Sequence, residues 1–310
     1  MERVDAVVIG AGVAGLTAGM YLHNRGRKTL VLEKKPDRYF LGGRARSILR
    51  LENYPGFEGV TGDAFVDHLV AQIESFNVPI KVNHDVVDIE AATDEKKVKV
   101  QTYDRQKDYR ARILFLCIGG GHSILGVPGE EMYYYRGVDD YVMAIHHGNL
   151  FIGRRVAVVG PDNRAVQTAL HLSQFARKVL YITHGPAIFD AYNRDQLEIA
   201  GIEYYEGSRV REIEGDGGIV RRIIIEKEGE ILSKRVRAVI IATDPSAKPE
   251  LPRKAGCALD ANGRIIVSKT GETNISGIYS AGDCVHGSGF SVASAVDLVV
   301  AAVKDSDKYF

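Results

Sequence analysis

The chain has 310 residues, with 40 basic and 40 acidic side chains, so its net charge is zero when histidine is neutral. That length predicts two domains, because a single hydrophobic core rarely grows beyond about 250–300 residues. The charge balance argues against a nucleic acid or an anionic membrane as partner, since no basic excess is left to neutralise phosphates. No apolar run approaches the roughly 20 residues that a membrane-spanning helix needs.

The N-terminus and the cysteines indicate the cellular compartment in which the protein is expected. The chain begins with charged residues and runs straight into an expected strand, so we expect no signal peptide. Its three cysteines, Cys117, Cys257 and Cys284, are scattered and predict neither a disulfide framework nor a zinc site. We therefore expect a soluble cytoplasmic protein in a reducing compartment, without a bound metal.

The first predicted unit is a strand, a glycine-rich turn, a helix and a second strand. Residues Asp5–Ile9 form a short apolar, β-branched run, which is typical of a buried parallel strand. The sequence Gly-Ala-Gly-Val-Ala-Gly follows at once. A helix is expected over Leu16–Asn24 and a second strand over Thr29–Leu32.

This unit carries the pattern of a dinucleotide-binding turn. Gly10 permits the tight turn, Gly12 lets the backbone approach a diphosphate, and Gly15 lets the helix pack closely on the strand. The helix N-terminus presents free N–H groups and the positive end of its dipole to the phosphates. Glu33, at the end of the second strand, is placed to accept hydrogen bonds from a ribose diol.

Two further segments help to decide which dinucleotide is bound. The loop Leu41-Gly42-Gly43-Arg44 is followed by Glu-Asn-Tyr-Pro-Gly-Phe at 52–57. Near the C-terminus, 277–283 is expected to form a strand and a Gly-Asp turn before a helix that begins at about Ser291. With the first unit, these segments resemble the FAD-dependent pyridine nucleotide-disulfide oxidoreductases, in particular the low-molecular-weight thioredoxin reductases. The resemblance covers essentially the whole chain.

The resemblance implies an FAD site. In that family the first glycine turn and the acidic strand end bind the adenosine half of FAD, the GG loop and the ENYPG-type segment line the flavin, and the aspartate of an Ala-Gly-Asp motif holds the ribityl chain. The matching positions are Gly10, Gly12, Gly15, Glu33, Gly42, Gly43, Asn53, Gly282 and Asp283. The expected site also includes Val13, Ala14, Lys34, Arg44, Val86, Gly119, Phe290 and Ser291. Phe290 is expected either to cover the flavin or to pack at the helix start, and Ser291 to cap that helix.

The middle of the chain is expected to hold a second nucleotide-binding unit. A strand over Arg112–Ile118 leads to a glycine-rich loop, which marks the crossover into an inserted domain, and a strand over Arg237–Ala242 returns. The strands and helices expected between them are Arg155–Val159, Ala165–Ala176, Lys178–Ile182 and the hairpin strands Arg209–Ile213 and Arg221–Lys227.

The predicted fold class is therefore α/β, with two Rossmann-like three-layer nucleotide-binding domains, the second inserted in the first. We expect a discontinuous FAD-binding domain over residues 1–115 and 246–310. The inserted domain, of the NAD(P)H-binding type, is expected over 116–245. The resemblance also implies a homodimer.

The family's redox dithiol is missing from its usual place. Thioredoxin reductases carry a Cys-x-x-Cys pair just before the second nucleotide-binding strand, but this chain has no cysteine between Cys117 and Cys257. Dithiol chemistry needs one attacking and one resolving thiol close together. We therefore expect that mechanism to be absent in its usual form.

The second glycine turn is also altered, so NAD(P)H binding is doubtful. The expected Gly-x-Gly-x-x-Ala reads Gly-Pro-Asp-Asn-Arg-Ala, which puts the Asp162 side chain where a diphosphate approaches the backbone, with the wrong charge. The basic cluster that grips a 2′-phosphate is replaced by Thr-His-Gly-Pro at 183–186. Arg164 is the residue left to support an NADH diphosphate.

Catalytic residues are not identified by any motif, and two candidates remain. His147, with its neighbour His146, is either a proton-transfer group beside the flavin or part of a solvated loop. Cys284 is either a thiol that reacts beside the flavin or a small buried residue. The tyrosines at 133–135 are expected to form an interface or domain-contact surface.

Three functions remain open. The first is an FAD-binding oxidoreductase that passes electrons through the flavin, with an unusual NADH mode or a small redox protein such as a ferredoxin as donor. Its acceptor is then oxygen, a quinone-like molecule or an external disulfide. The second is a genuine thioredoxin or disulfide reductase with a non-standard thiol. The third is a non-catalytic flavin-binding sensor or partner subunit.

Overall fold

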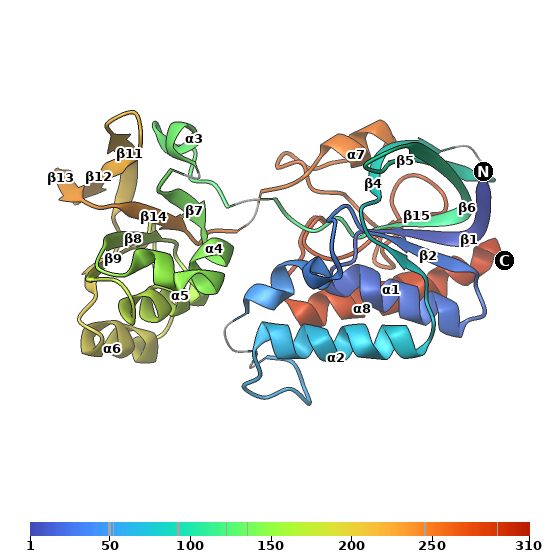
Figure 1. Ribbon diagram of the computed structural model, residues 1–310, viewed down its shortest axis with the longest axis horizontal. Coiled ribbons are helices and arrows are strands. Elements are labelled where there is room, and N and C mark those ends of the chain that lie inside the picture. The colour runs from blue at the N-terminus through green and yellow to red at the C-terminus, as the bar shows by residue number, and fades with distance from the viewer. Residues whose placement is uncertain are drawn as a thin grey trace. The chain divides into compact units, whose positions relative to one another are not determined.

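The computed structural model describes residues 1–48, 51, 53–91, 94–121, 123–134, 136–244, 246–289 and 291–310, apart from the side chain of Met143 (Figure 1). The chain forms two compact units. The first consists of Met1–Gly121 and Ser246–Phe310, and the second of His122–Pro245. Within the described ranges, no helix is long and apolar enough to cross a membrane.

A parallel sheet forms the centre of the first unit. Its strands run in the order β3-β2-β1-β6, and β15 pairs with the C-terminal half of β6. These strands are β1 (Glu2–Ile9), β2 (Thr29–Leu32), β3 (Ile80–Lys81), β6 (Gln106–Leu116) and β15 (Ile278–Ser280). Ile9 pairs with Leu32 of β2 and with Leu116 of β6, so the three strands end at one edge of the sheet. This edge positions the glycine turn that follows β1.

Two antiparallel strands extend this sheet along the N-terminal half of β6. They are β4 (Asp85–Ala91) and β5 (Lys96–Gln101), joined in the order β6-β5-β4. Within β5, buried and half-buried residues alternate, because one face covers the core and the other faces outward.

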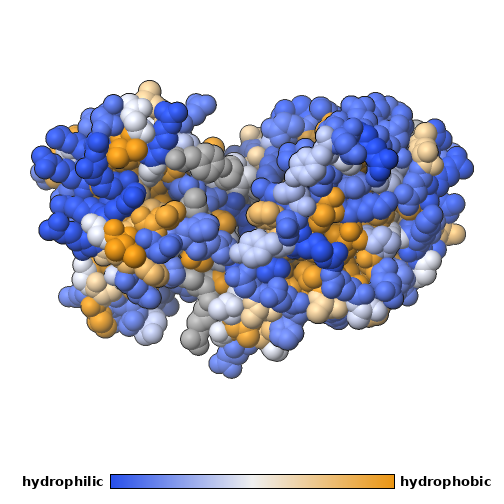
Figure 2. Space-filling model, in the orientation of Figure 1, coloured by the Kyte–Doolittle hydropathy of each residue, from blue (hydrophilic) through white to orange (hydrophobic). Residues whose placement is uncertain are grey.

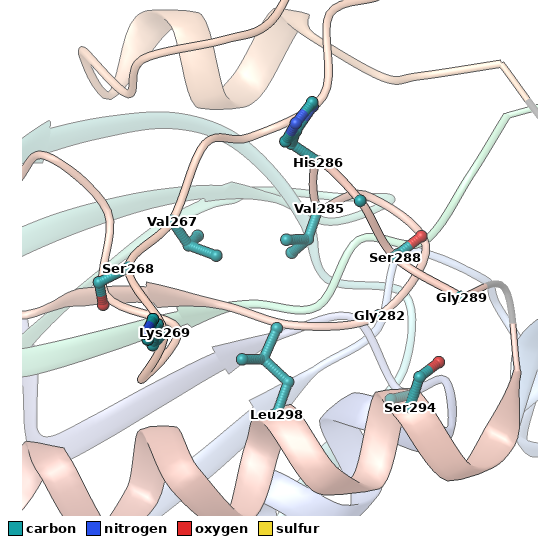
Figure 3. A pocket seen from close by; sticks show the side chains of 12 residues that line it. Val267, Ser268, Lys269, Gly282, Val285, His286, Ser288, Gly289, Ser294 and Leu298 are labelled. Carbon is teal, nitrogen blue, oxygen red and sulfur yellow. The ribbon is translucent and has the colours of Figure 1, made fainter.

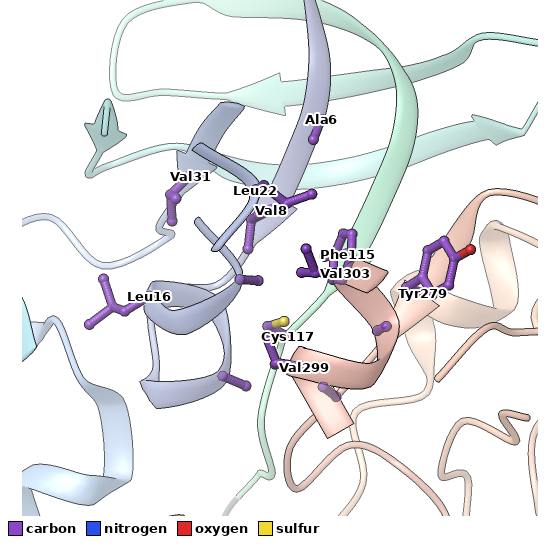
Figure 4. Packing of buried hydrophobic residues seen from close by; sticks show 14 of the residues in the cluster. Ala6, Val8, Leu16, Leu22, Val31, Phe115, Cys117, Tyr279, Val299 and Val303 are labelled. Atoms are coloured by element: carbon purple, nitrogen blue, oxygen red, sulfur yellow. The ribbon is translucent and has the colours of Figure 1, made fainter. Parts of the chain in front are cut away.

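Helices pack against the central sheet of the first unit. The helices are α1 (Val13–Asn24), α2 (Gly62–Ser75), α7 (Glu250–Lys254) and α8 (Val292–Asp305), with short helical turns η1 (Arg38–Phe40), η2 (Gly43–Ser47) and η4 (Ser306–Tyr309). Figure 1 shows α1, α2 and α8 on the same side of the sheet. Val8 of β1, Phe115 of β6 and Val299 of α8 are fully buried in the core between them (Figure 4). Burial of such apolar side chains is the main force that holds helix and sheet together.

The second unit repeats the arrangement on a smaller scale. Its five strands are all parallel, in the order β10-β9-β8-β14-β7. They are β7 (Val138–Asp140), β8 (Arg155–Val159), β9 (Lys178–Ile182), β10 (Glu203–Tyr205) and β14 (Ala238–Ile241). The helices are α3 (Glu130–Tyr133), α4 (Tyr141–His146), α5 (Asn163–Ser173) and α6 (Ala191–Ile199), with the turn η3 (Gly148–Phe151). A separate antiparallel sheet joins β11 (Arg209–Gly215), β12 (Val220–Lys227) and β13 (Glu230–Arg235).

These two units confirm the predicted fold class of two Rossmann-like α/β domains. The strands expected at 29–32, 155–159 and 178–182 occur with those bounds as β2, β8 and β9. The expectation of a tyrosine contact surface was wrong for Tyr133, which is 5% exposed and packs in the core of the second unit. Tyr135 lies outside the described residues.

Polar side chains cover most of the visible face of each unit in the space-filling view (Figure 2). Apolar side chains also reach this face in both units. The large apolar side chains among the described residues lie mainly in five buried clusters, three in the first unit and two in the second. The cores therefore account for most of the apolar pattern on which the fold prediction rests.

Candidate functional site

Two glycines of the first turn are fixed by close backbone contacts. Gly10 has φ of +98°, and a Cβ placed on it would lie 2.3 Å from the carbonyl oxygen of Cys117. A Cβ on Gly15 would lie 1.8 Å from the carbonyl oxygen of Gly10. Neither position accepts a side chain, so the turn and the start of α1 lie tightly on the sheet edge.

Gly12 is different, because its free side faces open space. It is the N-cap residue of α1, makes no side-chain hydrogen bond to the helix, and has no atom within 4 Å of a Cβ placed on it. Val13 and Ala14, in the first turn of α1, are buried. The first N–H groups of the helix are therefore without a side-chain cap and suit an anion.

Glu33 is held against this turn by two backbone donors. Its Oε2 accepts a hydrogen bond from the backbone N–H of Ala11 at 2.8 Å, and its Oε1 accepts one from Lys35 at 2.9 Å. The backbone of His84, just before β4, donates to the Glu33 carbonyl oxygen at 2.8 Å. This bond brings the start of β4 beside the end of β2.

Two other predicted residues lie in the same area. Lys34 is exposed and forms an ion pair with Asp85 at 2.9 Å, so its charge is already compensated. Val86 follows Asp85 in β4 and is buried in the apolar cluster on that side of the sheet. Val86 therefore belongs to the core of the first unit near the start of β4.

The GG loop is pressed onto the first glycine turn. The Gly42 N–H donates to the carbonyl oxygen of Ala11 at 2.7 Å, and a Cβ on Gly42 would lie 2.2 Å from a Val66 methyl carbon. Gly43 approaches Gly12, since a Cβ placed on it would lie 3.5 Å from the Gly12 Cα. The loop therefore borders the open side of the helix N-terminus.

The C-terminal segment completes the site. Gly282 has φ of +88°, and a Cβ on it would lie 3.3 Å from the Cβ of Ala14 in α1. Asp283 follows and is half-buried. The Ser291 hydroxyl caps α8 by accepting from the Ser294 N–H at 3.1 Å, as expected. Phe290 lies outside the described residues.

A pocket of about 320 Å³ lies beside this segment (Figure 3). Val267, Val285 and Leu298 point toward one another and form its apolar wall. Gly282 and the first turn of α8 also line it. The pocket therefore adjoins the end of the site where the resemblance places the flavin. By contrast, Asn53 is exposed in the segment before α2.

Two cations lie on the stretch that follows β6. Arg44 Nη1 donates to the carbonyl oxygen of Gly121 at 2.6 Å, and Lys248 Nζ donates to that of Ile118 at 3.4 Å. Gly119, between them, has φ of +60° and no atom within 4 Å of a Cβ placed on it. Lys248 was not predicted, because no motif marks a lysine in the loop that returns to the first unit.

The cysteine thiols are all buried. Cys284 is 2% exposed, and its Sγ donates to the Leu116 carbonyl oxygen at 3.4 Å. Burial raises the pKa of the Cys284 and Cys117 thiols, and it raises the pKa of Cys257 to about 11. These surroundings favour the neutral thiol over the reactive thiolate.

At the second glycine turn, a side chain of the turn itself caps the N-terminus of the following helix. Asp162 is the N-cap of α5, and its Oδ1 accepts hydrogen bonds from the backbone N–H groups of Arg164 at 3.1 Å and Ala165 at 3.3 Å. These are first-turn amides of the kind that a dinucleotide diphosphate uses. The carboxylate thus stands at this turn in the place of a phosphate.

Arg164 is bound within the same turn. Its guanidinium donates to the Thr243 carbonyl oxygen at 3.0 Å and forms ion pairs with Asp244 at 3.4 Å and Asp162 at 3.8 Å. Burial opposes its charge, but Tyr141 and the two carboxylates outweigh this and raise the pKa of Arg164. Its charge is therefore balanced by side chains of the protein.

The segment after β9 offers no cation for a 2′-phosphate. His184 accepts a hydrogen bond at Nδ1 from the Val210 N–H at 3.0 Å. Burial and the nearby Arg209 lower the pKa of His184, so its neutral form is favoured at neutral pH. Thr183 is buried, and its hydroxyl donates to the Gly185 carbonyl oxygen at 2.6 Å.

His147 lies in the second unit, where it is exposed at the start of η3. The ring centres of His146 and His147 are 6.4 Å apart. Across the described part of the chain, no group of three or more His, Cys, Asp or Glu residues is arranged to hold a metal ion.

These features define a class of protein with two dinucleotide-type turns, one open and one capped. The first unit fits FAD: open helix amides and nearby cations suit its diphosphate, Glu33 borders the ribose position, and an apolar pocket lies beside the Gly-Asp turn.

Comparison with known proteins gives the family. Residues 4–306 match the family model of the pyridine nucleotide-disulphide oxidoreductases, and the chain belongs to this family. It is a thioredoxin reductase-like, FAD-dependent oxidoreductase.

Relatives and solved structures agree with this assignment. The chain is 30% identical to the thioredoxin reductase of Mycolicibacterium smegmatis, over 98% of this chain and 96% of that protein. It is 29% identical to a 34.2 kDa protein in the rubredoxin operon of Clostridium pasteurianum, over 91% and 89%. The crystal structure of Lactococcus lactis thioredoxin reductase matches with a TM-score of 0.87 at 28% identity, over 99% of this chain and 98% of that one.

Proposed function

We propose that this protein passes electrons through FAD without a thiol relay, and that its electron donor is not NAD(P)H. The observation that carries the proposal is the Asp162 carboxylate, which accepts hydrogen bonds from the first-turn amides of α5. A dinucleotide diphosphate would have to displace this carboxylate and would meet its negative charge.

The cysteines support the absence of a thiol relay. The chain has three cysteines, and all three are buried and unpaired. A relay needs an accessible thiolate for attack and a second thiol to resolve the mixed disulfide. Cys284, the thiol nearest to Asp283 along the chain, donates to a backbone carbonyl in the core instead.

FAD supplies the redox chemistry when it is bound, and the protein holds and orients it. We propose a small redox protein such as a ferredoxin as donor, because an electron carrier of this kind needs no nicotinamide site. Oxygen, a quinone-like molecule and an external disulfide are the acceptors to be compared. We expect the protein to be a homodimer, which its mass in solution will test.

The test is anaerobic reduction of the purified yellow protein, in which the absorbance of the flavin is monitored. Reduced ferredoxin is expected to bleach the flavin faster than NADH or NADPH. Each acceptor is then added in turn to find which restores the flavin bands. The same cycle is repeated after treatment with iodoacetamide, which is expected to leave the rate unchanged because the thiols are buried.

Two results would replace this proposal by an alternative. Loss of turnover after alkylation, together with reduction of a protein disulfide, would indicate a disulfide reductase with a non-standard thiol. A flavin that no physiological donor reduces at a useful rate would indicate a non-catalytic flavin-binding sensor or partner subunit. A colourless protein that takes up no FAD would contradict all three functions.

A further inference from the structure

Lys248 lies in the segment that returns to the first unit, and its position is tied to the stretch after β6. The backbone N–H of Gly121 donates to the Ser246 carbonyl oxygen at 2.7 Å. Lys248 Nζ reaches the Ile118 carbonyl oxygen at 3.4 Å, and Arg44 Nη1 reaches that of Gly121 at 2.6 Å. Two cations from distant parts of the sequence therefore lie on residues 118–121.

This stretch is packed on the open glycine turn. A Cβ placed on Gly10 would lie 3.4 Å from the Cα of Ile118. The GG loop that carries Arg44 also approaches Gly12, since a Cβ on Gly43 would lie 3.5 Å from the Gly12 Cα. Lys248 and Arg44 therefore belong to the surroundings of the uncapped N-terminus of α1.

Several charged side chains surround Lys248. Arg44, Glu33 and Lys35 all act electrostatically on it. Lys248 as a whole is exposed, but partial burial of its ammonium group and then the positive charge of Arg44 lower the pKa of Lys248. Lys248 forms no ion pair with any described residue. Like charges at close range are unfavourable, and an anion bound among them removes that cost.

We propose that Lys248, together with Arg44, binds the diphosphate of FAD in addition to the first-turn amides of α1. The inference rests on the FAD site of the proposed function and adds a residue to it. It also accounts for a contrast between the two turns. The first leaves its helix without a side-chain cap, whereas in the second Asp162 and Asp244 pair with Arg164.

The test measures how tightly the holoprotein holds FAD, through the rise in flavin fluorescence after dilution. We expect Lys248→Gln to release FAD about 10-fold faster or more, because a hydrogen bond from a charged group to phosphate is lost. Lys248→Arg keeps the charge and is expected to stay near the wild-type rate. The matched control is Lys254→Gln, because Lys254 Nζ also donates to a backbone carbonyl, that of Val87 at 2.9 Å.

A second measurement separates a phosphate contact from a structural effect. The affinities of ADP and adenosine are each measured by their competition with FAD for the binding site. Lys248→Gln is expected to weaken the binding of ADP about 10-fold and to leave the binding of adenosine unchanged, since only ADP carries the diphosphate. Release of FAD at the wild-type rate, or equal weakening of ADP and adenosine, would overturn the inference. A wild-type protein that holds no FAD would overturn the proposed function itself.

Discussion

Gly12 and Asp162 hold the same N-cap position in the two strand–turn–helix units, but only Asp162 caps its helix with a side chain. Gly12 leaves the first amides of α1 open, and no atom lies within 4 Å of a Cβ placed on it. Asp162 accepts hydrogen bonds from two amides of α5. The residue at this N-cap position therefore decides whether the helix amides are open to an external anion or are occupied by a carboxylate of the protein.

Replacing Asp162 by glycine is expected to open the second turn. In Asp162→Gly the first-turn amides of α5 are freed and a negative charge is removed, so we expect NADH to bind at least ~10-fold more tightly. The cost in stability is small, a few tenths of a kcal/mol, because glycine is tolerated at an N-cap. Isothermal titration calorimetry with NADH checks the affinity.

The matched control for this variant is Asp190→Gly. Asp190 caps α6 in the same unit by accepting a hydrogen bond from the Asn193 N–H at 3.0 Å, but it does not follow β8. We expect it to lose the same small stability without any gain in NADH affinity. If the two variants bind NADH equally, the cap at Asp162 is not what limits binding.

Two substitutions in the first glycine turn are expected to have different effects, one on FAD binding and the other on folding. Gly12→Asp places a carboxylate at the open helix N-terminus, so FAD is expected to be lost while the folded protein is retained. Gly15→Ala is expected to abolish folding, because its Cβ would lie 1.8 Å from the Gly10 carbonyl oxygen. Visible absorbance reports bound FAD, and circular dichroism reports folding. A yellow, folded Gly12→Asp protein would contradict the assigned diphosphate site.

Thiol reactivity offers an independent check of the proposed electron route. All three cysteines are buried, and burial raises their pKa values, so native protein is expected to react slowly with Ellman's reagent. After unfolding in guanidinium chloride, all three thiols are expected to react. Cys284→Ser is expected to leave flavin reduction by ferredoxin unchanged. A thiol that reacts rapidly in the native state would favour the disulfide reductase alternative.

Glu203 is expected to contribute to the acid sensitivity of the second unit. Burial opposes its charge, but hydrogen bonds from Lys178, Tyr205 and Lys234 lower the pKa of Glu203 from 4.5 to about 2. Since the folded pKa lies below the unfolded one, this stability is present above pH ~4.5 and is lost as the pH falls toward 2.

The variant Glu203→Gln removes this titration. We expect it to cost about 1–2 kcal/mol at neutral pH, after allowance for solvent screening, and little at pH 2. Urea unfolding at several pH values measures the difference. A cost that is the same at pH 7 and pH 2 would show that the side chain acts by packing and not by charge.

Much of the fold was predictable because its signals are local. The apolar run before Gly10 and the glycine spacing after it correspond to β1 and α1, and β8 and β9 repeat the pattern. The antiparallel strands β4 and β5 were not predicted. Their apolar residues alternate with charged ones such as Lys97 and Lys99, and they carry no motif. Tyr133 was misplaced because aromatic residues in a short connector give no sign of burial.

The candidate site was predictable only where a backbone conformation demands a residue type. Glycines at 10, 15 and 282 are required by close approach or positive φ, and the sequence pattern shows this. Asp162 was expected to disturb the second turn, but its hydrogen bonds to α5 appear only in three dimensions. Lys248 was missed because its contact, the Ile118 carbonyl oxygen, lies 130 residues away in the chain.

The most direct test of the account is the anaerobic visible spectrum of the wild-type holoprotein after addition of NADH and then NADPH. We predict flavin bands that stay unchanged with both nucleotides and bleach when reduced ferredoxin or dithionite is added. Rapid bleaching by either nucleotide would show that a nicotinamide donor reaches the flavin despite Asp162, and would contradict the proposed electron route.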